Sequence, residues 1–125
     1  MTIATCAFFM QWVGVLSRKR IKLHVLIMNL SIALDLSLVL GLEIKRNAVE
    51  TVIQHKLHGL QIYHVLFSSV ATFLYVPMLI LGWSLYKNTD WITRKRSVWV
   101  SCHRNLGILT IGFRTLGWLM MWSLI

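Results

Sequence analysis

The chain has 125 residues, of which 57% are hydrophobic and 14% are charged, and it carries a net charge of +9. This composition is too apolar for a soluble domain, and the length leaves room for only one domain. The cations lie beside apolar stretches, as membrane topology requires, so the sequence argues against nucleic-acid binding.

Four apolar stretches are candidates for membrane-spanning helices, each of which needs roughly 20 apolar residues. They cover residues 2–16, 22–42, 59–86 and 105–125. The first is short, and it lacks the basic segment and small-residue cleavage site of a signal peptide. We therefore expect an all-α integral membrane protein, with residues 1–125 forming one transmembrane domain built as a four-helix up-down bundle.

Positive charge gathers in the two connections on one side of this expected bundle. Nine Lys and Arg residues lie there: Arg18, Lys19, Arg20, Lys22, Lys87, Arg94, Lys95, Arg96 and Arg104. The third connection, on the other side, holds only Lys45, Arg46 and Lys56. The basic side is predicted to face the cytoplasm or an organellar matrix, with both termini on the opposite side. This pattern favours a bacterial or organellar inner membrane, with lipids as partners.

The second and fourth stretches share an unusual spacing. His24 is followed eleven residues later by Asp35, and His103 is followed eleven residues later by Arg114. Eleven residues make almost three helical turns, so each histidine shares a helix face with its charge. Both stretches run away from the basic side, which places the charges roughly 16 Å deeper than the histidines. The spacing predicts His24 opposite His103, and a buried ion pair between Asp35 and Arg114.

Three further histidines lie in or just before the third stretch. His64 is a candidate either for the polar layer of the ion pair or for a second cofactor site. His55 and His58 have a three-residue spacing suited to metal ligands, but a third ligand is missing. The favoured interpretation of both is that they are interfacial residues at a helix start. Hydrolytic or nucleophilic chemistry has no support, because neither a paired-carboxylate site nor a catalytic triad is found.

Two family resemblances involve these residues. The run from Ile21 to Met28, and Tyr63-His64 followed by Pro77, resemble helices of small histidine-bearing four-helix membrane proteins of oxidase maturation (CtaM-like). Residues 58–82 and the run Cys102-His103-Arg104-Asn105-Leu106-Gly107 resemble bacterial four-helix b-type cytochromes, in which such a histidine holds haem iron. Such cytochromes commonly hold two haems. A second histidine deeper in the last stretch is absent here, so the resemblance implies one haem.

The leading hypothesis is a membrane electron-transfer protein that holds one b-type haem between His24 and His103. Lys22 and Arg104 would pair with the haem propionates, and quinone would be the redox partner. The alternative is a cofactor-free accessory or assembly subunit of a respiratory or photosynthetic complex, with other membrane subunits as partners. The third hypothesis is a carrier or proton pathway built on Asp35, Arg114 and His64. A subunit is expected rather than a stand-alone enzyme.

Overall fold

The computed structural model describes residues 2–46, 50, 54 and 59–123. These residues form four long helices, which confirms the all-α prediction for the described part of the chain. The long helices are α1 (Thr2–Leu16), α2 (Ile21–Arg46), α4 (Gly59–Lys87) and α6 (Arg96–Ser123). A 3₁₀ turn, η1 (Ser17–Lys19), joins α1 to α2, and the short helix α5 (Asp90–Thr93) lies between α4 and α6.

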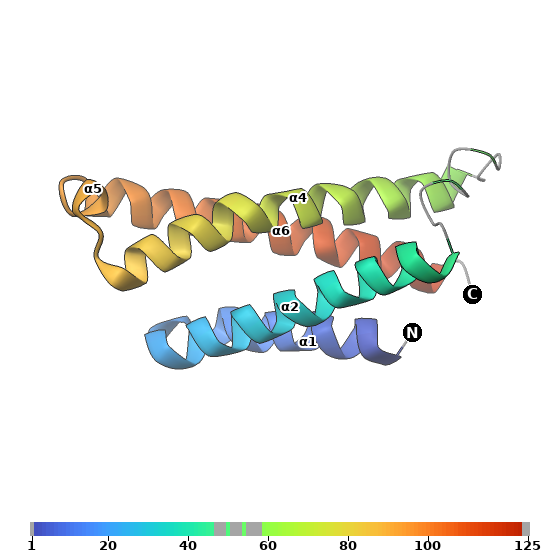
Figure 1. The fold of residues 1–125 in the computed structure, drawn as a ribbon, viewed down its shortest axis with the longest axis horizontal. Coiled ribbons are helices and arrows are strands. Elements are labelled where there is room, and N and C mark those ends of the chain that lie inside the picture. The colour runs from blue at the N-terminus through green and yellow to red at the C-terminus, as the bar shows by residue number, and fades with distance from the viewer. Residues whose placement is uncertain (1, 47–49, 51–53, 55–58, 124–125) are drawn as a thin grey trace.

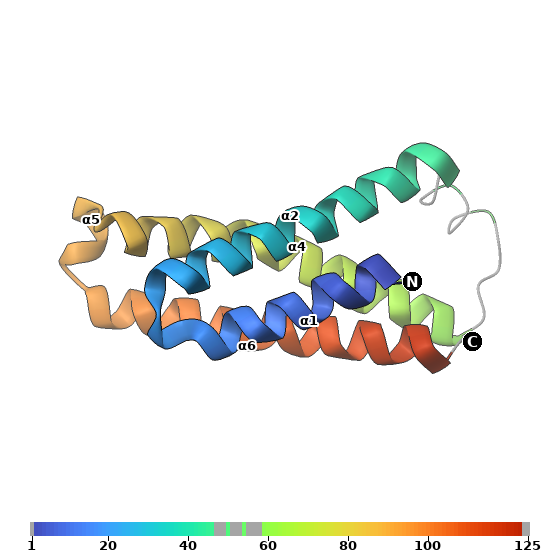
Figure 2. The ribbon, with the colours of Figure 1, turned by 90° about the horizontal axis from the view of Figure 1, so that it is seen from below.

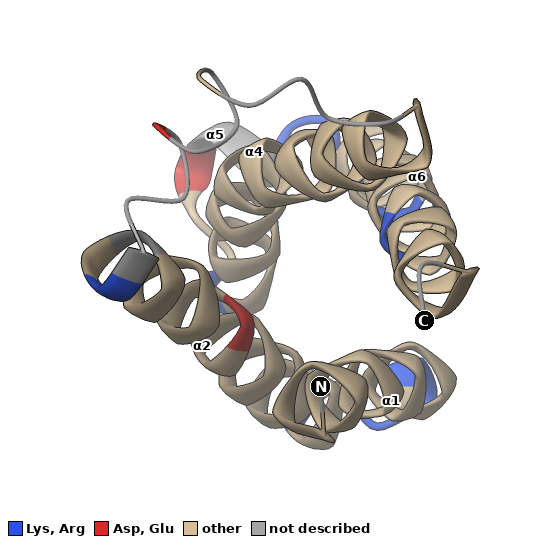
Figure 3. Ribbon diagram, turned by 90° about the vertical axis from the view of Figure 1, so that its right-hand side faces the viewer, with Lys and Arg blue, Asp and Glu red and all other residues tan. Residues whose placement is uncertain are grey.

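Successive long helices run in opposite directions, so both ends of the chain lie at the same end of the structure (Figure 1). Seen from that end, the helices follow one another around the structure in the order α1, α2, α4 and α6 (Figure 3). Each helix contacts its two neighbours in this order, and α1 packs mainly on α2 while α4 packs mainly on α6. Helices α2 and α6 are therefore diagonal to each other.

The helix limits differ from the apolar stretches by more than two residues at two places. Helix α2 continues to Arg46 rather than ending at residue 42, and α6 begins at Arg96 rather than at residue 105. Hydropathy marks only the apolar part of a helix, whereas Lys and Arg are good helix formers and extend it. Of the described helices, two have the length and apolar composition to cross a membrane, over Ile21–Leu42 and Gly59–Lys87. Helix α1 has 15 residues.

Small residues bring α4 and α6 close together. A Cβ atom built at Gly117 would lie 2.9 Å from Ser68 Oγ, and one built at Gly82 would lie 3.0 Å from His103 Cε1. A larger side chain at either glycine would push the helices or their side chains apart. Such close approach through small residues is typical of helix pairs that pack without a hydrophobic driving force.

The interior is small and lies where the helices meet. Ile32, Tyr75 and Met78 form its buried cluster, with Met28 and Leu79 packed against it. Large apolar side chains are exposed on all four long helices, including Phe9, Leu26, Phe73 and Ile108. The second half of α2 diverges from α1 and α4 (Figure 2), and it carries further exposed side chains. A soluble protein rarely exposes apolar surface on every side.

Candidate functional site

One polar side chain from each long helix meets in the middle of the structure. Gln11 Nε2 donates a hydrogen bond of 2.7 Å to the hydroxyl of Tyr75. The Tyr75 hydroxyl in turn donates a hydrogen bond of 2.6 Å to Asp35 Oδ2. The guanidinium of Arg114 completes the network with an ion pair to Asp35 Oδ1. We refer to Gln11, Asp35, Tyr75 and Arg114 as the polar layer.

The charge of Asp35 is compensated within this layer. Asp35 is only 3% exposed, and each of its carboxylate oxygens accepts a hydrogen bond. An uncompensated charge at such a position is costly, whereas a paired and hydrogen-bonded one is tolerated. Arg114 Nε is buried and has no hydrogen-bond partner. Because the bonds cross from helix to helix, the polar layer can fix the register of all four long helices.

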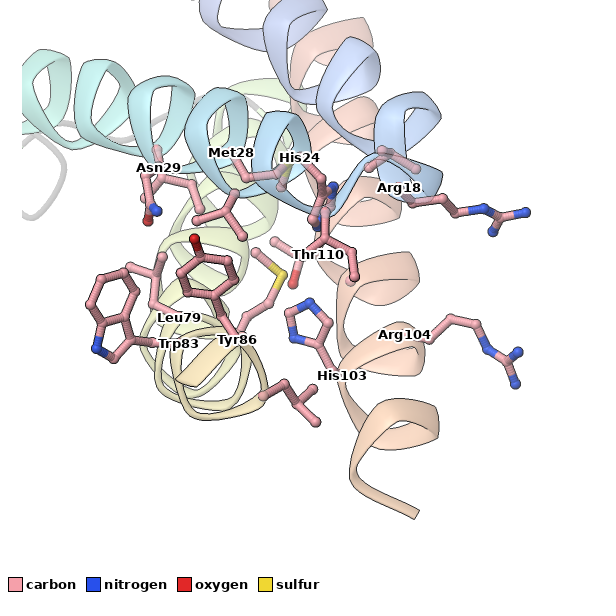
Figure 4. A pocket seen from close by; sticks show the side chains of 18 of the residues that line it. Arg18, His24, Met28, Asn29, Leu79, Trp83, Tyr86, His103, Arg104 and Thr110 are labelled. Atoms are coloured by element: carbon pink, nitrogen blue, oxygen red, sulfur yellow. The ribbon is translucent and has the colours of Figure 1, made fainter. Parts of the chain in front are cut away.

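We refer to the end of the structure that carries η1 and α5 as the basic end. A cavity of about 660 Å³ lies between the polar layer and the basic end. His24 of α2 and His103 of α6 both line it, and their rings point into the same space in the close-up view (Figure 4). Tyr75 and Gln11 of the polar layer also line it. The two histidines thus reach one cavity from diagonal helices, although 79 positions separate them in the sequence.

The orientation of His24 is set by a backbone carbonyl. Its Nδ1 lies 2.6 Å from the carbonyl oxygen of Gly14, at the end of α1. A carbonyl can only accept a hydrogen bond, so Nδ1 of His24 carries the proton and donates it. In the neutral ring, the lone pair therefore lies on Nε2. This is the tautomer in which a histidine ligates a metal while its other nitrogen is held in place.

His103 is held by packing rather than by a hydrogen bond. Its ring lies against Gly82 of α4, with Cε1 only 3.0 Å from the position that a Cβ atom would occupy. Its Nδ1 is buried and has no hydrogen-bond partner within the described residues. A buried, unpartnered polar atom is unusual and calls for an explanation, such as a ligand or an ordered water.

The walls of the cavity are mainly apolar, and its charged lining residues are all cations. Met28, Ile32 and Met78 contribute to the apolar walls. The cations are Arg18, Lys22, Arg96 and Arg104. Asp and Glu are absent from the described lining residues. A site of this kind suits an apolar ligand that carries negative charge at one edge.

The other candidate histidines lie away from this cavity. His64 Nδ1 donates a hydrogen bond of 2.7 Å to the carbonyl of Gly117, one helical turn along α6 from Arg114. The Nδ1 of His64 is therefore hydrogen-bonded to the backbone of α6 rather than to the ion pair. His55 and His58 lie outside the described residues. Among the residues that the structure describes, no three His, Cys, Asp or Glu side chains gather to hold a metal ion.

Two members of the polar layer were not expected from the sequence. Tyr75 lies eleven residues after His64, which repeats the spacing of the other two helices, but a tyrosine in an apolar stretch resembles an interfacial aromatic. Gln11 is the only amide in α1. Side-chain amides in apolar helices commonly form hydrogen bonds between helices, and this was the available signal.

The chain was compared with known protein families, curated proteins and solved structures. No protein-family model, curated protein or solved structure matches the chain.

Proposed function

We propose that the protein is a membrane electron-transfer protein or subunit that holds one b-type haem through His24 and His103. The observation that carries this proposal is the cavity that both histidines line from diagonal helices. A bound haem would supply one-electron chemistry, and the protein would supply axial ligands, orientation and an apolar surrounding. We assign quinone as the redox partner, since it is an apolar carrier that shares the same membrane.

The donor set fits a porphyrin better than a bare metal ion. Two imidazoles reach the cavity, and further His, Cys, Asp or Glu ligands are absent from its described lining. A protein-bound metal ion generally needs three or four protein ligands. A porphyrin supplies four nitrogen ligands itself and leaves two axial positions, which two histidines can fill.

The surroundings of the two rings support the same assignment. The Gly14 carbonyl leaves the Nε2 lone pair of His24 available as a ligand. His103 lines the cavity, and its buried Nδ1 forms no hydrogen bond within the described protein, so the ring is not committed to a protein acceptor. Lys22 and Arg104 line the cavity and are assigned to the propionates.

We further propose that this site lies within a membrane. Two described helices have the length and composition of membrane spans, and apolar side chains cover the outside of all four long helices. Helix α1, at 15 residues, extends roughly 22 Å, which is shorter than a bilayer core of about 30 Å. We infer an up-down topology with the basic end, where the cavity lies, on the cytoplasmic or matrix side.

A reduced-minus-oxidised visible spectrum of the purified full chain tests the haem. We expect the α-band of a b-type haem in the wild type, and its loss in both His24→Ala and His103→Ala. His64→Ala is the matched control, since His64 lies on α4 and bonds to Gly117 rather than lining the cavity. Folded wild-type protein that takes up no added haem would overturn the proposal.

A cofactor-free accessory or assembly subunit is the second candidate. It is favoured by one observation: the second half of α2 diverges from the other helices and exposes apolar side chains such as Leu40 and Ile44 (Figure 2). In a larger complex, another membrane subunit would cover this face. Co-purification of a stoichiometric membrane subunit, together with a spectrum lacking haem, is the outcome that would favour this candidate.

A further inference from the structure

The open side of the cavity carries two arginines from distant parts of the chain. Arg18 belongs to η1, which follows α1, and Arg104 belongs to α6. Both line the cavity, and both extend beyond it on the same side, opposite Trp83 and Tyr86 (Figure 4). The helical hairpin α1–α2 and the helical hairpin α4–α6 each contribute one of them.

The two arginines differ from the third arginine of the lining in having no partner in the described protein. Arg96 is bound to Asn88 Oδ1 and to the carbonyl of Leu85. Arg18 and Arg104 form no hydrogen bond or ion pair with the described residues. Arginine stems can lie along an apolar surface while their guanidinium groups reach into water. The two guanidiniums are thus placed at the edge of an apolar site without a competing acid in its described lining.

We propose that Arg18 and Arg104 form an anion clamp that binds the two carboxylates of one flat amphiphile, whose apolar body lies between His24 and His103. The inference rests on the proposed haem. It puts Arg18 in place of Lys22 as the partner of the second carboxylate, and it gives the direction in which the ligand faces. Guanidinium groups bind carboxylates with two parallel hydrogen bonds, which a lysine does not do. In this arrangement the carboxylates would point out of the cavity on the side of the arginines.

The test compares two ligands that differ in these charges and otherwise only in two methyl groups. Ferric protoporphyrin IX carries two carboxylates, whereas its dimethyl ester keeps the iron and the ring but loses both negative charges. We would titrate each into the full chain in non-ionic detergent and follow the bis-imidazole spectrum. For two partly exposed charge pairs, we expect the wild type to bind the acid about tenfold more tightly than the ester.

Substitutions locate the source of this preference. Arg18→Gln and Arg104→Gln should each reduce the preference for the acid, and the double variant should bind both porphyrins alike. Lys19→Gln is the matched control, because it removes the same charge from η1 at an exposed residue outside the cavity lining. Its preference for the acid should stay that of the wild type. Circular dichroism of each variant reports whether the helices are intact.

The outcomes separate the clamp from the haem itself. Equal wild-type affinity for the acid and the ester, or a preference that survives in the double variant, would overturn the clamp and leave the haem proposal standing. Binding of neither porphyrin with an imidazole-ligated spectrum would overturn both. If Lys19→Gln loses the preference for the acid to the same extent, the preference comes from the general positive potential of the basic end. That result would also contradict the clamp.

Discussion

The polar layer and the histidine cavity are adjacent regions with opposite character. In the polar layer, hydrogen bonds link Gln11 to Tyr75 and Tyr75 to Asp35, and Asp35 forms an ion pair with Arg114, whose buried Nε has no partner among the described residues. In the cavity, two histidines share an open volume, and the Nδ1 of His103 has no partner. Polar groups that satisfy one another stabilise a fold, whereas polar groups that face open space are available to a ligand. We therefore interpret the first region as structural, and the second is the region that we propose to bind a ligand.

The largest effect should come from breaking the ion pair of the polar layer. Asp35→Asn leaves the guanidinium of Arg114 without its counter-charge, and we expect a loss of about 3–5 kcal/mol in the free energy of unfolding. Arg114→Gln should cost a similar amount, since it leaves the Asp35 carboxylate alone. Denaturant unfolding followed by circular dichroism measures both.

The double variant of Asp35 and Arg114 sharpens this result. Because the two residues are in contact, its cost should be smaller than the sum of the single costs by about 0.5–3 kcal/mol. Additive costs would contradict a direct pair between α2 and α6.

Tyr75→Phe tests the rest of the polar layer. It removes the hydroxyl that joins Gln11 to Asp35, and keeps the ring, so we expect a loss of about 1–3 kcal/mol in the free energy of unfolding. Tyr63→Phe is the control, since Tyr63 lies on the same helix and is 52% exposed. If both variants lose the same free energy of unfolding, the hydrogen bonds of the Tyr75 hydroxyl make no specific contribution to stability.

Gly82→Ala tests the cavity rather than the polar layer. The new methyl group would lie 3.0 Å from His103 Cε1 and would displace the ring. We expect a loss of about tenfold in haem affinity, or about 1.4 kcal/mol, with the secondary structure intact. Gly112→Ala adds the same methyl group to α6 at a position with open space, and its haem affinity should match that of the wild type. Spectral titration of both variants with haem provides the comparison.

His64→Leu should have the smallest effect. It removes one hydrogen bond to the Gly117 carbonyl at similar side-chain volume, which costs about 1 kcal/mol in the free energy of unfolding. The haem spectrum should stay that of the wild type, because His64 does not line the cavity. A changed spectrum would place a ligand on the far side of the polar layer and would weaken the distinction between the two regions.

The sequence allowed the positions of the helices and of two side-chain layers to be predicted, because both depend on spacing along a single helix. Hydropathy located the long helices, and the eleven-residue spacing placed Asp35 and Arg114 at matching depth. Hydropathy missed the first two turns of α6, since charged residues extend a helix without adding apolar character. The contact of His103 with Gly82 and the hydrogen bond from His24 to Gly14 depend on how helices approach each other, which no single-helix pattern specifies.

The carbonyl of Gly14 that orients His24 lies only ten residues before it in the chain. One ligand of the proposed haem can therefore be set within the first helical hairpin, α1–α2, before the rest of the bundle assembles. His103 takes its position from Gly82, within the second hairpin. A molecule held by both histidines would bridge the seam between the two hairpins. It would bind the assembled bundle in preference to the separated hairpins, and would thereby favour assembly by mass action.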